Sequence, residues 1–215
     1  GQYTLLLSVP LGIATAMGTS IIPSVVASYN SEDYDGVKYK INSVIKFNMM
    51  IAIPCAVGFS VLGTQIIYMI FPNLVTYRHV AGMMLLTGSI ALVFYALSTV
   101  TSGVLQAVNQ MKLPMIHSAI SLAIHVVLVF VLLQYTDLGV YALIVGNITF
   151  PLVVCVLNWH SVGKCLDYQQ EIRTTFMLPA MAALIMGVVC FVSYHGFHLI
   201  IGQIGNLFNL GEYFN

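Results

Sequence analysis

The charged residues of this sequence are confined to a few short segments, and long uncharged stretches separate these segments. Asp, Glu, Lys and Arg together make up only 7% of the chain, against roughly 25% in an ordinary soluble domain. They fall at residues 32–46, Arg78, Lys112, Asp137, 164–173 and Glu212. Each stretch between two of these places has at least 24 residues, and about 20 apolar residues are enough to cross a bilayer as a helix. This spacing predicts a chain that crosses a membrane several times.

Composition and pattern exclude the main alternatives to a helical membrane protein. The hydrophobic fraction is 59% and the mean hydropathy is +0.94, which is more apolar side chain than one water-soluble core of this size can bury. Strands of a membrane barrel alternate polar and apolar residues, whereas runs such as "IHVVLVFVLLQY" do not alternate. We therefore predict an all-α, polytopic membrane helix bundle. Its six spans are expected at about 3–28, 45–71, 80–108, 113–134, 138–159 and 175–195.

Positive charge is distributed unequally between the predicted connections. If the spans alternate in direction, the connections at 29–44, 109–113 and 160–174 share one side of the membrane. The positive side chains on or at the edge of that side are Lys38, Lys40, Lys46, Lys112, Lys164 and Arg173. The other side holds only Arg78. Because Lys and Arg are enriched in cytoplasmic loops, the first side is predicted to be cytoplasmic and the first helix to run from outside to inside.

Both ends of the sequence suggest a piece of a longer protein. The chain begins at Gly1 without a methionine or a signal-peptide pattern. Residues 196–215 mix Ile, Leu and Phe with four Gly and three Asn, which suits an external interfacial segment better than a span. We expect a transmembrane bundle over residues 1–195, an external segment over 196–215, and a preceding part and a last helix that this sequence does not include.

Side chains that usually carry catalysis or metal binding form no recognisable set. The four cysteines have no C-x-x-C spacing, so packing thiols are favoured over a zinc site or disulfides. His125 lies near the middle of a span, where a titratable group is a functional candidate, but no acid lies within any span to pair with it, so a hydrogen bond to a neighbouring helix is favoured. There is no nucleophile elbow, phosphate-binding loop or basic patch. We expect no cofactor, no metal, no nucleic-acid partner and no enzymatic activity.

The first predicted span carries small residues at every fourth position, which form one slowly drifting ridge along a helix. The residues of this ridge are Ser8, Gly12, Ala16, Ser20, Ser24 and Ser28. Close helix packing is one interpretation, and a mildly polar wall of a substrate cavity is the other. Pro10 and Pro23 in the same span favour a bending, moving helix. Gln106 and Asn109, at the end of the third span, are further cavity candidates, with capping of that helix end as the alternative.

The order of several motifs resembles a known family. "TSIIPSVVASY" precedes an acidic turn, and "IAIPCAVGF" and "IIYMIF" follow it. "TSGVLQAVNQMKLPM" and then "LGVYALIVGNI" come further along the chain. Over about residues 1–195 the sequence is similar to the second half of bacterial polysaccharide and lipid-linked oligosaccharide flippases of the stage V sporulation protein B type. These are relatives of the lipid II flippases in the multidrug/oligosaccharidyl-lipid/polysaccharide (MOP) exporter superfamily.

This resemblance implies one lobe of a two-bundle transporter of the bacterial cytoplasmic membrane. The chain would match the eighth to thirteenth of fourteen helices, a register that agrees with the orientation drawn from the lysines. The implied function is flipping of an undecaprenyl-linked polysaccharide or peptidoglycan precursor by alternating access. The implied partners are the lipid-linked oligosaccharide, membrane lipids and an N-terminal lobe of the same protein. Lipid II flippases hold the diphosphate with arginines inside their spans, and no predicted span here contains an arginine.

Other classes of protein stay open at this point. An ion-coupled multidrug exporter of the same superfamily is one, although the predicted spans contain no carboxylate for coupling. An intramembrane transferase or protease is another, and it would need a polar catalytic cluster that the sequence does not show. A structural membrane subunit is the third. The sequence does not indicate which sugar lipid or coupling ion a transporter of this kind would use.

Overall fold

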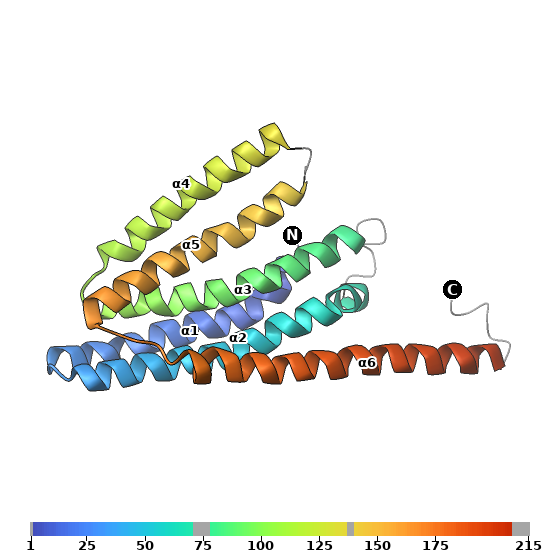
Figure 1. The fold of residues 1–215 in the computed structure, drawn as a ribbon, viewed down its shortest axis with the longest axis horizontal. Helices are drawn as coiled ribbons and strands as arrows, with labels where there is room; N and C mark the ends of the chain where they lie inside the picture. The colour runs from blue at the N-terminus through green and yellow to red at the C-terminus, as the bar shows by residue number, and fades with distance from the viewer. Residues whose placement is uncertain (1, 71–77, 137–139, 208–215) are drawn as a thin grey trace.

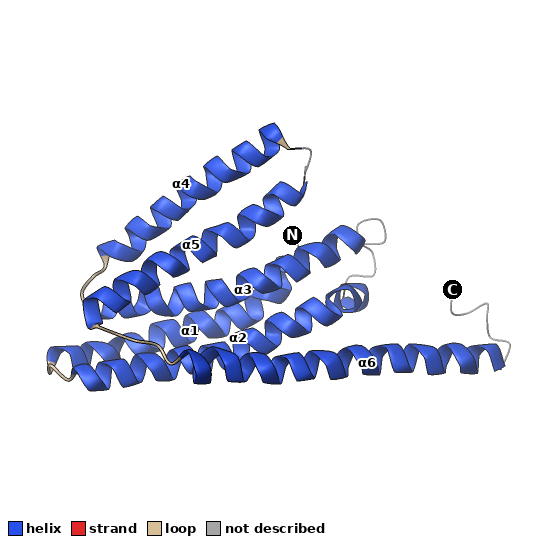
Figure 2. Cartoon of the chain, viewed as in Figure 1, coloured by secondary structure: helices blue, strands red, loops and turns tan. Residues whose placement is uncertain are grey.

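The computed structural model describes residues 2–70, 78–136 and 140–207, and these residues form long helices joined by short loops (Figures 1 and 2). The elements are α1 (Gln2–Asn30), α2 (Tyr34–Ile70), α3 (Arg78–Ala107), α4 (Lys112–Tyr135), α5 (Val140–Leu166), the π-helical turn η2 (Arg173–Met177) and α6 (Leu178–Leu207). Within these described ranges, six helices are long and apolar enough to cross a membrane. The predicted all-α membrane bundle of six spans is confirmed.

The second helix begins earlier than the sequence predicted. We expected it to start near residue 45, but α2 begins at Tyr34. The Asp33 carboxylate accepts a hydrogen bond of 2.9 Å from the Gly36 backbone N–H, which caps the helix N-terminus where a negative charge is also favourable. The charges at 32–46 made this stretch resemble a loop, so the predicted boundary is wrong.

The fifth and sixth helices extend beyond their predicted ends. α5 continues to Leu166 instead of ending near 159. α6 passes through the expected end at 195 without a break and continues to Leu207. Residues 196–207 therefore belong to the same helix as the last span. Their placement outside the membrane stays a prediction, and residues 208–215 lie outside the described part of the chain.

The third helix occupies the centre of the bundle. α3 packs against α1, α2 and α5, while α4 packs mainly against α5, and α6 mainly against α2 (Figure 1). The largest fully buried apolar side chains come chiefly from α2 and α3. They are Ile41, Ile45, Met49, Leu85, Leu92 and Leu105. Because lipid is as apolar as these side chains, close packing and interhelical hydrogen bonds hold the helices together.

Two glycines allow α1 and α3 to approach until their backbones touch. A Cβ atom built at Gly103 would lie 2.5 Å from the carbonyl oxygen of Gly18. A Cβ built at Gly18 would lie 3.3 Å from the Thr99 carbonyl oxygen. Small residues at such positions are the usual means of close contact between membrane helices. This contact fixes the distance between the two helices next to the cavity described below.

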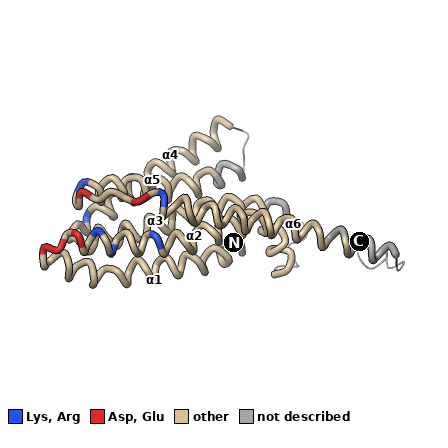
Figure 3. The backbone as a smooth tube through the Cα atoms, turned by 60° about the horizontal axis from the view of Figure 1, so that its bottom comes forward, with Lys and Arg blue, Asp and Glu red and all other residues tan. Residues whose placement is uncertain are grey.

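Charged residues gather toward one end of the bundle, as Figure 3 shows. The α1–α2 and α3–α4 connections and the loop from α5 to η2 all lie at this end, which we call the charged end (Figures 1 and 3). The prediction that 29–44, 109–113 and 160–174 share one side is confirmed. That this side is cytoplasmic stays a prediction from the excess of Lys and Arg.

Candidate functional site

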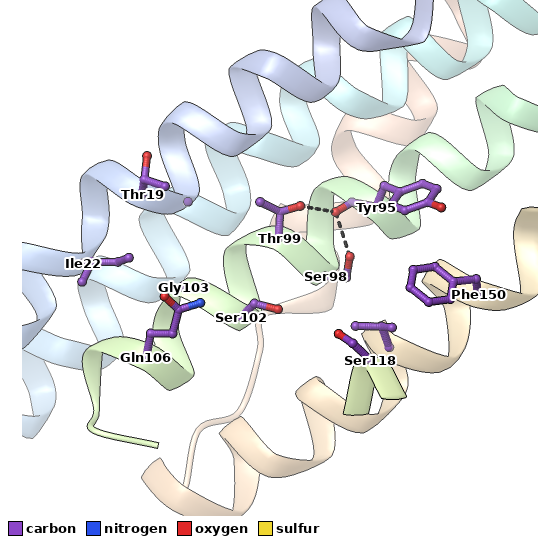
Figure 4. A pocket seen from close by; sticks show the side chains of 12 residues that line it. Thr19, Ile22, Tyr95, Ser98, Thr99, Ser102, Gly103, Gln106, Ser118 and Phe150 are labelled. Carbon is purple, nitrogen blue, oxygen red and sulfur yellow. Dashed lines mark hydrogen bonds between the residues drawn. The ribbon is translucent and has the colours of Figure 1, made fainter. Parts of the chain in front are cut away.

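A cavity of about 330 Å³ lies where α1, α3, α4 and α5 meet (Figure 4). Its size is at the lower end of the range for small-molecule sites. Tyr95 and Phe150 stand at one wall, with ring centroids 6.3 Å apart. The polar side chains that line it are Thr19, Ser98, Thr99, Ser102, Gln106 and Ser118. We call this cavity the polar pocket.

The α-helical repeat explains why α3 supplies most of the polar groups. Ser98, Ser102 and Gln106 are spaced four residues apart, so they lie on one face of the helix. Thr99 flanks this row. None of the described residues that line the polar pocket is charged. Hydroxyl and amide groups are able to hydrogen-bond a neutral polar ligand within the membrane without the cost of a buried charge.

The ridge predicted on α1 points away from the other described helices. Its members from Ser8 to Ser24 are exposed, and only Ser28 is buried. The face of α1 that packs on the bundle consists of Leu7, Pro10, Ala14, Gly18, Ile21, Val25 and Ser28. Close packing within the described bundle therefore does not explain the spacing of Ser8, Gly12, Ala16, Ser20 and Ser24. Their role as a cavity wall stays a prediction.

The outward face of α1 differs from those of α4 and α6. On α4 most of the exposed side chains are large and apolar, and Val127 is 62% exposed. On α6 the same holds, and Leu184 is 61% exposed. Such side chains are favourable in contact with acyl chains. Between residues 12 and 24, α1 instead exposes mainly Gly, Ala, Ser and Thr, so this stretch is poorly suited to face lipid.

The two candidates at the end of α3 have different roles. Gln106 is exposed and lines the polar pocket. Asn109 has a φ of 61° in the left-handed region and ends the helix. The Gln110 N–H donates to the Leu105 carbonyl and the Asn109 N–H donates to the Gln106 carbonyl, at 2.9 and 3.2 Å, which is the Schellman arrangement. Asn109 does not line the polar pocket, and the capping interpretation is confirmed for it.

Sequence reasoning missed a buried hydrogen-bonded pair behind the polar pocket. His117 of α4 and Asn158 of α5 are both buried, and His117 Nδ1 lies 2.7 Å from Asn158 Oδ1. Neither His117 nor Asn158 was singled out from the sequence. The sequence does contain a signal for this pair, namely two polar residues within apolar spans. Such residues tend to form hydrogen bonds with each other across helices.

The favoured interpretation of His125 is confirmed. Its Nδ1 lies 2.9 Å from the Gly146 carbonyl oxygen on α5, so it forms a hydrogen bond to a neighbouring helix. Gly146 makes room for the ring, because a Cβ there would lie 2.8 Å from His125 Cε1. One turn before His125, the buried Ser121 hydroxyl donates to the Phe150 carbonyl at 2.7 Å. These bonds hold α4 against α5.

The loop before η2 is fixed to α2 by a chain of polar contacts. The Gln170 side-chain amide donates to Asn42 Oδ1 at 2.8 Å and to Thr175 Oγ1 at 2.6 Å. The Tyr168 hydroxyl donates to Gln170 Oε1. Burial, and secondly the nearby charge of Glu171, raise the pKa of Tyr168. Among the described residues, no group of three or more His, Cys, Asp or Glu could hold a metal ion.

The described part of the chain has six membrane-length helices, four of which surround an uncharged polar cavity, and this arrangement defines a multi-pass membrane protein. Residues 2–208 match the family described as "Lipid II flippase MurJ". The chain belongs to this family, and it is a multi-pass protein of the cytoplasmic membrane.

Two curated relatives are similar over most of this chain. The lipid II flippase MurJ of Bacillus subtilis (strain 168) is 25% identical, over 85% of this chain and 34% of its own length. The probable lipid II flippase MurJ of Bdellovibrio bacteriovorus is 26% identical, over 93% of this chain and 38% of its own length. The chain thus spans about a third of the length of these relatives. No solved structure matches it.

Proposed function

We propose that this chain forms one lobe of a transporter that flips a lipid-linked cell-wall precursor from the inner to the outer leaflet by alternating access. Membership of the lipid II flippase MurJ family supports the class of activity. The observation that carries the assignment to this lobe is the small, polar outward face of α1. A wall that alternately meets water and a sugar headgroup needs small hydroxyl-bearing residues, and a lipid-facing wall does not.

The same proposal specifies the place of the chain in the whole transporter. It forms most of the C-terminal half, as the similarity to the sporulation-type flippases implies, and an N-terminal lobe lies across the cavity from α1. The exposed part of the ridge then lines the space between the lobes, and the polar pocket opens beside it. This exposed part consists of Ser8, Gly12, Ala16, Ser20 and Ser24. The substrate is an undecaprenyl-linked glycan, with lipid II favoured over a polysaccharide precursor by the names of the relatives. The lobe moves its substrate and catalyses no covalent step.

Substitutions on the outward face of α1 test this proposal. Ser20→Leu and Ser24→Leu in the full-length protein each add a large side chain to an exposed helix surface. We expect both to abolish flipping of lipid II in proteoliposomes while insertion and thermal stability stay unchanged. Ser20→Ala, which adds no volume, is expected to flip normally. Ala123→Leu on the exposed face of α4 is the matched control for added bulk toward lipid.

The outcomes separate a cavity wall from a packing surface. If Ser20→Leu lowers the melting temperature and reduces flipping only in proportion, the ridge is a packing surface against another part of the protein. If Ser20→Leu flips lipid II as well as Ala123→Leu does, α1 does not line the path. A wild-type protein that does not flip lipid II or any undecaprenyl-linked sugar would refute the transport proposal itself.

A further inference from the structure

Asn158 is fully buried and makes three hydrogen bonds to two other helices. Its Nδ2 donates to the Ser102 hydroxyl oxygen at 2.8 Å and to the Ser98 carbonyl oxygen at 3.3 Å, both on α3. Its Oδ1 lies 2.7 Å from His117 Nδ1 on α4. A backbone carbonyl is able only to accept, so the amide nitrogen has to face α3 and the amide oxygen has to face His117. It follows that His117 Nδ1 carries the hydrogen of that bond.

This orientation determines which hydrogen-bonding groups α3 presents to the polar pocket. Because the Ser102 oxygen accepts from Asn158, its own O–H is left to donate, and no acceptor for it occurs among the described residues. The Ser98 and Thr99 hydroxyls both donate to the Tyr95 carbonyl oxygen, at 2.9 and 2.8 Å (Figure 4). Their oxygen lone pairs are left to accept. These three hydroxyls therefore offer one donor beside two acceptors, and none of them carries a charge.

We propose that Asn158 is a positioning residue that sets Ser102 as a hydrogen-bond donor, and that the polar pocket binds a neutral sugar ring of the lipid-linked substrate. A ring oxygen or acetamido carbonyl accepts from Ser102, and sugar hydroxyls donate to Ser98 and Thr99. The Tyr95–Phe150 wall packs against the apolar face of the ring. This inference rests on the proposed flippase function and adds to it a subsite within the lobe, apart from the ridge on the outward face of α1.

His117 completes the arrangement from the far side. It occupies the Asn158 oxygen, and its Nε2 lies 3.4 Å from the Ser161 hydroxyl oxygen. The amide therefore has all its groups satisfied in this orientation, and a rotation by 180° would place its oxygen against the Ser98 carbonyl. An unpaired buried polar group is costly. The network thus keeps the Asn158 amide in one orientation, and through it keeps the Ser102 O–H free to donate.

Asn158→Asp in the full-length protein tests the assignment with almost no change of shape. A carboxylate accepts from both His117 and Ser102, so the Ser102 O–H turns away from the polar pocket. We expect the affinity for lipid II in detergent to fall about tenfold, the worth of one hydrogen bond. Ser102→Ala is expected to give a similar loss. The double variant should lose no more affinity for lipid II than either single variant, because both changes remove the same hydrogen-bond donor.

Controls distinguish positioning from general damage. Undecaprenyl diphosphate, which has no sugar, should bind the wild type and both variants equally, and Ser102→Thr should keep lipid II affinity. The assignment of Asn158 and the polar pocket is wrong if the losses of lipid II affinity in Asn158→Asp and Ser102→Ala add in the double variant. It is also wrong if the variants lose as much affinity for undecaprenyl diphosphate as for lipid II. In either case the flippase proposal stands. If Asn158→Asp does not accumulate in cells, the two Ser102 variants test the proposal by themselves. Equal affinities of Ser102→Ala and Ser102→Thr for lipid II would then overturn it.

Discussion

Gly103→Ala is the most direct test of how α1 and α3 are held together. The new methyl carbon would lie 2.5 Å from the Gly18 carbonyl oxygen, whereas close carbon–oxygen contacts in proteins are about 3.3–3.6 Å. The obstacle is backbone and has no rotamer with which to move aside. The two helices therefore have to separate locally by about 0.8 Å. A gap of that size forfeits roughly a quarter to a half of each affected van der Waals contact.

The expected cost is that of overpacking, about 1–3 kcal/mol. For a chain of this size it corresponds to a fall in melting temperature of about 2–12 °C, at roughly 2–4 °C per kcal/mol. Alanine also favours the helical state over glycine by about 1 kcal/mol, and this gain would conceal part of the loss. Gly12→Ala supplies the correction, because a methyl group at Gly12 meets no atom within 4 Å.

The measurement is the melting temperature of the purified protein in detergent, which is monitored by light scattering or by the exposure of buried thiols. The difference between Gly103→Ala and Gly12→Ala isolates the clash from the helix propensity. We expect Gly103→Ala to melt several degrees lower and Gly12→Ala to melt at or slightly above the wild-type temperature. Equal melting temperatures of the two variants would refute the close backbone contact between α1 and α3.

Two further predictions concern the charged end. Cys165 is exposed there, so a membrane-impermeant thiol reagent should modify it in inverted vesicles, and labelling in intact cells would show that the assigned orientation is reversed. Because the pKa of Tyr168 is raised by burial and by Glu171, its neutral form stabilises the fold below the ordinary value near 10, and this stability is lost as the pH rises above it. Tyr168→Phe should flatten the decline in melting temperature above about pH 10, and an unchanged decline would contradict this account.

The membrane architecture could be predicted because the bilayer imposes length and polarity on each span separately. Uncharged stretches of sufficient length predicted all six helices, and charge placement predicted which connections share an end. The start of α2 was misplaced for a local reason. The charges at 32–46 depress hydropathy, but Asp33 caps the helix, and Val37 and Ile41 are fully buried on its inner face. Hydropathy measures suitability for lipid and not the tendency to form a helix.

The candidate site was harder to predict because it depends on which helix faces meet. Spacing within α1 identified the ridge, and the helical repeat places Gln106 on the same face as Ser98 and Ser102. That this face meets α5 at Asn158 is a property of the packed bundle. A short polar side chain in an apolar span predicts only that some partner exists. Four-residue spacing by itself also failed to separate the inner face of α1 from its outer face.

The packing contact and the polar pocket are linked through two adjacent residues of α3. Gly103 touches the α1 backbone, and Ser102 receives the hydrogen bond from α5. A change that separates α1 from α3 therefore also moves Thr19 and Gly18 away from Ser102, and it widens the pocket. The ridge lies on the outward face of α1 and would keep its surface unchanged. Gly103→Ala should consequently weaken recognition of the sugar through the pocket, whereas Ser20→Leu should block the path and leave the pocket intact. The two surfaces can thus be tested independently within one lobe.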